Sequence, residues 1–392
     1  MAVTTRSAPD SGYLGAARRL RDPLLLFVLP VSFALLLAFA GYASSWPIGF
    51  DFRGTLWEPA RALLDGTAVY PEPTENAVAI GNPAVYPPVF ILASIPLALL
   101  PVTVASWLWV VMLLACVLAA LWIVGVRDWR CHVLALTSLV VVHGLYFGNL
   151  TLVLVLLVAL AWRYRDRARV AGLTVGVAVA AKLFVAPLLV WLLLTRRYRA
   201  AAWAAVSATV LVFGSWLLIG FEGLADYPAL LGVLQDVYAI RSLSVATVSA
   251  ALGAPVGLAV ALAALAGLVC LGLAWWFSRG HDADRKCFTA TVTACVVASP
   301  VVWPNYYALL YIPIALRWPR LAPAWFFGHA IWLAALLAPS RKTNEVCCRP
   351  EDVTEQAWLA AHADPLFWLP AAAMALVGVV LLLTTIDRRR LA

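Results

Sequence analysis

Long apolar runs separated by short charged intervals are the feature that most limits the folds open to this chain of 392 residues. Hydrophobic residues make up 64% of the sequence and charged residues only 12%. An apolar helix of about 20 residues spans the hydrocarbon core of a bilayer, and the runs lack the alternation of transmembrane barrel strands. The sequence therefore predicts an all-α polytopic membrane protein with about twelve transmembrane helices, some of them short or re-entrant.

The first apolar run, residues 24–42, follows a segment, residues 1–23, that carries four arginines. This run is too long for the core of a signal peptide, and no obvious small-residue cleavage site follows it. We therefore expect an uncleaved first helix and a single transmembrane domain over residues 24–386, with short tails at residues 1–23 and 387–392.

The charged residues fall into two groups. Seven short clusters hold 21 Lys or Arg residues and 7 Asp or Glu residues. The longer intervals 43–88, 222–248 and 340–364 together hold 6 Lys or Arg residues and 13 Asp or Glu residues. Basic loops tend to stay on the cytoplasmic side of a membrane. We therefore expect cytoplasmic termini and three external loops in a plasma-membrane protein, and the net charge of +8 does not indicate a nucleic-acid partner.

Lys182 is the one charged residue inside apolar sequence. The apolar segment around it, residues 170–195, is too short for two full spans, yet basic clusters flank both of its ends, as they do for residues 131–162. Two shallow helical hairpins resolve this, and they would leave an outward-facing cavity in which a charge is tolerated. Lys182 is then a functional candidate, although a cation that snorkels to the headgroups or pairs with an acid fits as well.

Asp51 lies a few residues beyond the first apolar run, at the expected border of the bilayer. Partial desolvation there would raise the pKa of its carboxyl toward neutrality, as a general base requires. A solvated loop carboxylate at a helix end explains the same position equally well.

Amide and aromatic side chains gather at the other expected outer turns, at Tyr86-Pro87-Pro88, Tyr146-Phe147-Gly148-Asn149 and Trp303-Pro304-Asn305-Tyr306-Tyr307. Such groups suit sugar rings, but an interfacial aromatic belt explains any single Trp or Tyr as well.

Other motifs indicate no metal or cofactor. Asp282-Ala283-Asp284 has the Asp-x-Asp spacing of metal-dependent sugar transferases, but it lies in a basic turn expected on the cytoplasmic side. The cysteines show no zinc-ligand spacing, and only the adjacent pair Cys347-Cys348 is expected outside. We expect no obligatory metal.

These residues together resemble glycosyltransferase family 87, the polyprenyl-phosphate-sugar-dependent transferases of the GT-C class in actinobacterial envelope synthesis. The marks that carry the resemblance are Phe50-Asp51-Phe52, Tyr86-Pro87-Pro88, Tyr146-Phe147-Gly148-Asn149, Ala181-Lys182-Leu183 with Pro187, Arg196-Arg197-Tyr198-Arg199, and Ser299-Pro300 before Trp303.

The resemblance implies a membrane enzyme that moves a sugar from a polyprenyl-phosphate donor to a hydroxyl group of an envelope glycolipid or glycan, on the outer face and with inversion. It implies Asp51 as the catalytic base. If that assignment is off by a helical turn or two, its neighbours Glu58 and Asp65 are the replacements. The residues expected to bind the donor phosphate or the substrates are Lys182, Arg53, Tyr86, Asn149, Trp303, Asn305, Tyr306 and Tyr307.

Two departures from the family pattern bear on the sugar. Asn149 stands where Gln is common, and Pro304-Asn305-Tyr306-Tyr307 stands where mannosyl members often carry a His pair. Mannose is favoured, and arabinofuranose, whose transferases have a Tyr pair at this turn, is the alternative. A lipid or sugar flippase, which could also use a midplane lysine, and a non-catalytic scaffold remain alternatives of other classes.

Overall fold

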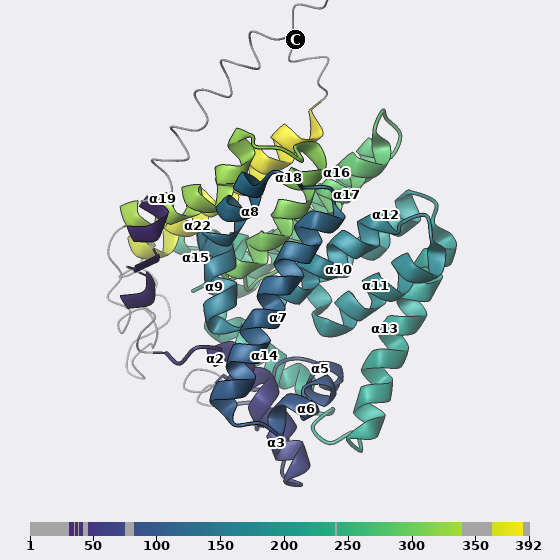
Figure 1. Ribbon diagram of the computed structural model, residues 1–392, viewed down its shortest axis with the longest axis vertical. Coiled ribbons are helices and arrows are strands. Elements are labelled where there is room, and N and C mark those ends of the chain that lie inside the picture. The colour runs from purple at the N-terminus through teal and green to yellow at the C-terminus, as the bar shows by residue number, and fades with distance from the viewer. Residues whose placement is uncertain are drawn as a thin grey trace, which may run out of the picture. The chain divides into compact units, whose positions relative to one another are not determined.

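The computed structural model describes residues 31–34, 36–37, 39–41, 46–74, 82–239, 241–338 and 363–386. The chain forms two compact units, residues 1–45 and residues 46–392. The described residues of the first unit are helical, as is every described element of the second (Figure 1). The all-α prediction is thus confirmed for the described residues. Both predicted tails, most of the loop 340–364 and Cys347-Cys348 lie outside them.

The second unit contains α-helices, short 3-10 helices (η2, η3 and η4) and one π-helical stretch (η1). In chain order they are α2 (Phe50–Phe52), η1 (Arg53–Trp57), α3 (Glu58–Leu64), α5 (Pro88–Ala93), α6 (Ile95–Ala98), α7 (Val102–Ile123), α8 (Trp129–Leu136), α9 (Leu139–Phe147), α10 (Thr151–Arg163), α11 (Ala168–Ala181), η2 (Leu183–Val185), α12 (Pro187–Leu194), α13 (Tyr198–Leu218), α14 (Tyr227–Tyr238), α15 (Val245–Ala251), α16 (Val256–Phe277), α17 (Ala283–Val297), η3 (Pro304–Leu310), α18 (Tyr311–Arg317), η4 (Pro323–Phe326), α19 (Phe327–Leu337) and α22 (Ala363–Thr385).

Four of the described helices are long and apolar enough to cross a membrane, namely α7, α13, α16 and residues 367–385 of α22. A fifth span results if α8 and α9, which meet at an angle of 60°, are one broken helix. Large apolar side chains of α13 and α16 point outward, including Leu218 at 75% exposure and Leu268 at 62%. Bilayer lipid would cover such surfaces. The chain is therefore a membrane protein, and the count of about twelve crossings stays a prediction.

Helices break at the two positions where the sequence predicts hairpin turns. Helix α9 ends in the left-handed residue Gly148, with φ of 70°, and α10 begins three residues later. Helix α11 ends just before Lys182. The extended backbone of Lys182 separates α11 from η2 and α12. Because a helix leaves its last carbonyl groups unpaired, these breaks bring free backbone and polar side chains together inside an apolar bundle.

Helices α11 and α13 pack closely because α11 presents glycine to its neighbour. A Cβ atom at Gly172 would lie 2.6 Å from the carbonyl oxygen of Ala200, and one at Gly176 would lie 2.7 Å from that of Ala204. The two contacts advance in the same direction along both helices, so α11 and α13 run parallel. Small residues four apart are a common way to bring membrane helices into contact.

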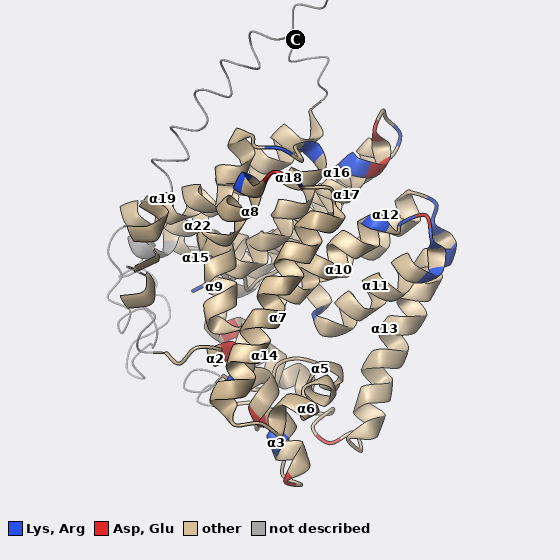
Figure 2. Ribbon diagram, viewed as in Figure 1, with Lys and Arg blue, Asp and Glu red and all other residues tan. Residues whose placement is uncertain are grey.

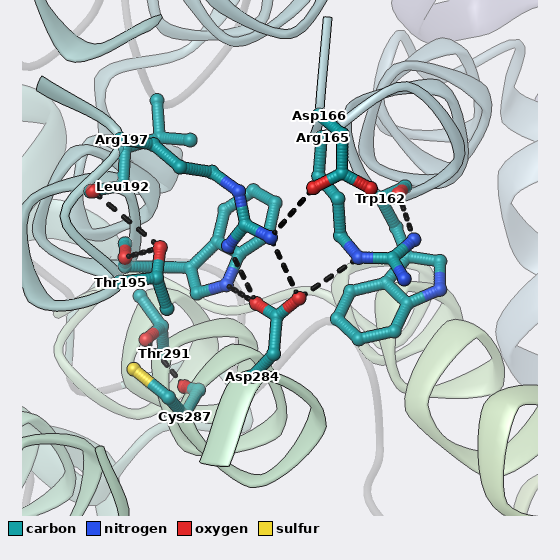
Figure 3. A network of polar contacts seen from close by, with 10 residues as sticks. Trp162, Arg165, Asp166, Leu192, Thr195, Arg197, Asp284, Cys287 and Thr291 are labelled. Atoms are coloured by element: carbon teal, nitrogen blue, oxygen red, sulfur yellow. Dashed lines mark hydrogen bonds and ion pairs between the residues drawn. The ribbon is translucent and has the colours of Figure 1, made fainter. Parts of the chain in front are cut away.

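Asp284 joins three segments at the beginning of α17 (Figure 3). Its Oδ2 accepts hydrogen bonds from Nε of Arg165 at 2.8 Å and Nη2 of Arg197 at 2.9 Å. Its Oδ1 accepts from Nη1 of Arg197 at 2.8 Å and from Nε1 of Trp191 at 3.0 Å. The second acid of the Asp-x-Asp motif therefore fastens α17 to the α10–α11 and α12–α13 turns.

Lys and Arg residues gather where helices begin or end, around α8, α12, α13 and α16 (Figure 2). In the same view the acidic residues of α2 and α3 lie toward the opposite end of the second unit. The two groups that the sequence separates by charge are thus also separated in space within this unit.

Replacing Asp284 by Asn should lower the free energy of unfolding by about 1–3 kcal/mol, because hydrogen bonds to charged partners are lost in a partly buried site. Asp282→Asn is the matched control: in the described part of the chain Asp282 pairs with Arg285 alone, three residues away, and its side chain is 38% exposed, so the loss should be under about 1 kcal/mol. Thermal unfolding in detergent measures both. Equal losses would contradict the role given to Asp284.

Candidate active site

Asp51 lies on α2, a single turn that continues directly into the π-helical stretch η1 and then α3. Gly49 precedes it in the left-handed conformation, with φ of 73°, and its N–H donates to the carbonyl oxygen of Tyr146 at 2.8 Å. Thr55 donates its hydroxyl hydrogen to the backbone carbonyl of Asp51. π-Helical turns are rare and occur often at functional sites, and this one fixes the backbone around the carboxylate.

Asn149 links Asp51 to Lys182. Its Nδ2 donates to Oδ2 of Asp51 at 2.6 Å, and its Oδ1 accepts from Nζ of Lys182 at 3.1 Å. Thr151 donates to the same Oδ1 from its backbone N–H at 3.0 Å and from its hydroxyl at 2.7 Å. Because these three donors require an oxygen, the orientation of the amide is fixed and its nitrogen must face Asp51.

Lys182 is 6% exposed, and its ammonium group is surrounded by polar atoms and aromatic faces. Besides Asn149, its Nζ donates to Oγ1 of Thr151 at 3.0 Å and to the hydroxyl of Tyr306 at 3.4 Å. The ring centroids of Tyr86 and Tyr306 lie 4.9 Å and 4.6 Å away. Such cation–π contacts help to stabilise a cation that has left water.

Two further tyrosines hold the Tyr86 segment in place. Tyr70 donates its hydroxyl hydrogen to the carbonyl oxygen of Tyr86 at 2.7 Å, and Tyr227 donates to that of Val85 at 2.9 Å. On the other side of Lys182, the ring of Phe184 stacks on Tyr306 at 4.6 Å. Both aromatic faces around the ammonium group are therefore positioned by neighbours from other elements.

The polypeptide backbone approaches itself closely around Asp51. A Cβ atom at Gly148 would lie 3.0 Å from Cα of Gly49 and 3.1 Å from Cβ of Phe52. A Cβ atom at Gly54 would lie 2.3 Å from the carbonyl oxygen of Asn82, and Nδ2 of Asn82 donates to Oδ1 of Asp51 at 3.3 Å. Glycine at these two positions therefore lets the segments that carry Asn149 and Asn82 reach the carboxylate.

Burial raises the pKa of the Asp51 carboxyl above its ordinary value of 3.8, and the hydrogen bond from Asn149, the charge of Lys182 and the hydrogen bond from Asn82 each offset part of this rise. Asp51 lies outside the helices that could span the membrane. Asp51 is half-buried, whereas Asn149 is only 3% exposed. A carboxylate with a raised pKa can accept a proton from a bound hydroxyl group.

The structure brings five of the nine predicted site residues into one cluster: Asp51, Tyr86, Asn149, Lys182 and Tyr306. We call this set the Asp51–Lys182 cluster. Of the two acids considered as replacements for Asp51, Glu58 is exposed on α3, and Asp65 pairs with Arg61 with its side chain 51% exposed.

The other four predicted residues make their contacts elsewhere. Arg53 donates from Nε to the carbonyl oxygen of Ile48 at 2.9 Å and to Oγ of Ser106 at 3.1 Å. Tyr307 is fully buried and donates to the carbonyl oxygen of Leu243. Asn305 is also fully buried, against Gly144, and Trp303 packs its ring edge-on to Tyr238. The turn 303–307 therefore contributes Tyr306 to the cluster, and its other side chains pack into the fold.

Sequence reasoning missed Asn82 and Thr151, although both contact the cluster directly. Thr151 follows Asn149 by two residues at the start of α10, so the expected helix start was the signal that could have identified it. Asn82 lies in the long loop after α3, and no local pattern distinguishes it from the other polar loop residues.

Among the described residues, no group of three or more His, Cys, Asp or Glu side chains could hold a metal ion. The expectation of a metal-independent reaction stays a prediction.

Comparison with known proteins identifies a family. The sequence model of glycosyltransferase family 87 matches residues 84–304, which is more than half of the chain. The matched region contains Tyr86, Asn149 and Lys182, whereas Asp51 precedes it and Tyr306 follows it. No curated protein matches the chain, and no solved structure does. The family match agrees with the resemblance expected from the motifs.

Replacing Gly148 by Ala should destabilise the protein more than replacing Gly253 by Ala. Both glycines have positive φ, 70° and 92°, but a Cβ atom at Gly253 meets nothing within 4 Å. Each change should cost about 1 kcal/mol from backbone strain, and the contacts with Gly49 and Phe52 should add about 1–3 kcal/mol at Gly148. Thermal unfolding of the two variants measures the difference. Equal destabilisation of the two variants would mean that a Cβ atom at position 148 does not clash with Gly49 and Phe52.

Proposed function

Because the chain belongs to glycosyltransferase family 87, it is a membrane glycosyltransferase, and we propose that it uses a polyprenyl-phosphate sugar as its donor. The acceptor is a hydroxyl group of an envelope glycolipid or glycan. Mannose is the favoured sugar, and arabinofuranose is the alternative. The observation that supports this function best is the hydrogen-bonded chain from the carboxylate of half-buried Asp51 through Asn149 to the buried ammonium group of Lys182.

The proposed reaction is a single displacement. Asp51 accepts the proton of the acceptor hydroxyl while the oxygen of that hydroxyl attacks the anomeric carbon of the sugar. The bond between the anomeric carbon and the phosphate oxygen breaks, and its electron pair goes to the phosphate. The configuration at the anomeric carbon inverts. Asn149 orients the carboxylate. Among the described residues, Oδ1 of Asp51 accepts only the long 3.3 Å bond from Asn82, so this oxygen has capacity left for the acceptor hydroxyl.

Lys182 has the role of offsetting the charge that develops on the leaving phosphate. A compact ammonium group binds phosphate as a point charge, and its effect is large where water is excluded. Of its three hydrogen bonds, the one to Tyr306 is the longest, at 3.4 Å. A donor phosphate would replace this contact and leave the shorter bonds to Asn149 and Thr151 in place. Because Tyr306 belongs to the cluster and is half-buried, whereas Tyr307 is fully buried, only the first of the two tyrosines would contact the sugar.

The proposed topology follows from the charge distribution. The basic helix ends and both chain termini lie on the cytoplasmic side. The acidic intervals 43–88, 222–248 and 340–364 lie on the outer side. The Asp51–Lys182 cluster then opens toward the outer face within a GT-C type bundle of about twelve crossings, in the plasma membrane.

Replacing Asp51 by Asn should lower the rate of sugar transfer by about 10²–10⁴-fold, because the base is lost while the hydrogen-bonding shape remains. Asp65→Asn is the matched control: it removes the same charge from the end of α3, where Asp65 pairs with exposed Arg61, and the rate should not change. In the assay, membranes that contain the wild type or a variant are supplied with a glycolipid acceptor and with labelled polyprenyl-phosphate mannose or polyprenyl-phosphate arabinose. The rate at which the labelled sugar is transferred to the acceptor is measured.

Transfer of mannose supports the favoured donor, and transfer of arabinose alone supports the alternative. If neither sugar is transferred by the wild type, or if D51N is as active as the wild type, the proposed mechanism is wrong.

The rate of transfer should depend on pH through Asp51. The base acts in its ionised form, so the rate should fall as the pH drops below the pKa of this carboxyl, by about tenfold per pH unit. Since burial raises that pKa above 3.8, the midpoint should lie above pH 3.8. His143→Gln is the control, because His143 lies on α9 and outside the Asp51–Lys182 cluster. A midpoint below pH 3.8, or one that moves in H143Q, would contradict the assignment.

A further inference from the structure

A second polar site lies at the opposite end of α11 from Lys182. A hollow of about 440 Å³ opens there, and the charged side chains that line it are four arginines, Arg165, Arg196, Arg197 and Arg199, and one acid, Asp166. Helix α11 has 14 residues, so about 20 Å separates the hollow from the Asp51–Lys182 cluster. The hollow is therefore distinct from the proposed active site.

Two helices begin side by side at this hollow. Ala168, the first residue of α11, lines it, as do Tyr198 and Ala200 in the first turn of α13. The close packing at Gly172 and Gly176 keeps these two parallel helix starts together. Neither start has a side-chain cap, and the first N–H groups of a helix have no partner within it. Two positive helix ends thus add to the charge of the arginines.

The arginines of the hollow divide into two pairs with different surroundings. Arg165 and Arg197 bind Asp284, and Arg197 also bonds Asp166, whose side chain is 77% exposed (Figure 3). Arg196 and Arg199 are exposed, and within the described part of the chain no ion pair involves either of them. The first pair is thus held rigid by the fold, and the second remains available for an anion.

We propose that this hollow binds a phosphate group carried by an anionic membrane lipid or by free phosphate. A phosphate group carries several acceptor oxygens on one small anion. Paired N–H groups of an arginine guanidinium and the free N–H groups of a helix start can donate hydrogen bonds to these oxygens together. The hollow lies at the end of α13, a helix long enough to span the membrane, where lipid headgroups are found, and basic pockets between membrane helices bind such headgroups. An arginine cluster that only fixed topology would need neither a hollow nor two uncapped helix starts.

The test uses the purified full-length chain in a neutral detergent and three probes: dioctanoyl phosphatidate, inorganic phosphate, and dioctanoyl phosphatidylcholine as the zwitterionic comparison. Binding is followed as the saturable rise of the unfolding temperature with probe concentration. Saturation by phosphatidate alone identifies a lipid headgroup site, and saturation by both phosphate and phosphatidate identifies a general phosphate site; either supports the proposal. No saturation by these two probes, or equal saturation by phosphatidylcholine, overturns it.

Three variants locate the binding. The double variant R196Q/R199Q should lose affinity by at least about tenfold. The control R279Q/R320Q removes the same charge from residues that do not line the hollow and should bind as the wild type does. Asp166→Asn should bind about two- to fivefold more tightly, because the acid that competes for Arg197 is removed.

A gain of affinity cannot result from misfolding, so D166N keeps the test valid if the double variant is unstable. Equal affinity of R196Q/R199Q and the wild type, or no gain in D166N, overturns the proposal. No measurement here depends on sugar transfer, so failure of this inference and failure of the proposed function are separate results.

Discussion

The buried amide of Asn149 is the contact on which the arrangement of the candidate site depends. It holds the carboxylate of Asp51 through its nitrogen and the ammonium group of Lys182 through its oxygen. An ionised side chain without such partners is expensive to bury in an apolar bundle. The three residues come from α2, the α9–α10 turn and the end of α11, so the polar contact that provides Lys182 with a hydrogen-bond acceptor also fixes three segments relative to one another.

Interrupted helices make this contact sterically and electrostatically possible. A continuous membrane helix satisfies its own backbone and presents only side chains, whereas a helix that stops leaves backbone groups and room for polar side chains. Helices α9 and α11 both stop at the cluster, and η1 places Asp51 against them. Glycine at positions 49, 54 and 148 removes the side chains that would keep these backbones apart.

Helix α11 has a polar site at each end and apolar packing between them. At one end Lys182 is surrounded by hydroxyl, amide and aromatic groups, and at the other the arginines around Asp284 meet two helix starts. The glycine contacts with α13 connect the two ends through a rigid parallel pair. An apolar span confines charge to its ends, which is why both polar sites of this molecule occur where helices begin or stop.

The sequence by itself determined the helical class, the membrane environment, the positions of the breaks at Asn149 and Lys182, and five residues that meet in one cluster. Hydropathy, charge and the cost of a buried lysine act locally, so they can be read along the chain. Only the tertiary structure decided that Arg53 and Tyr307 form hydrogen bonds elsewhere and that Asn305 is buried against Gly144. It also decided that Asn82 and Thr151 contact the cluster and that Asp284 fastens the basic turns. These outcomes depend on contacts between distant segments, where close backbone approach and hydrogen-bond geometry select among side chains of the same type.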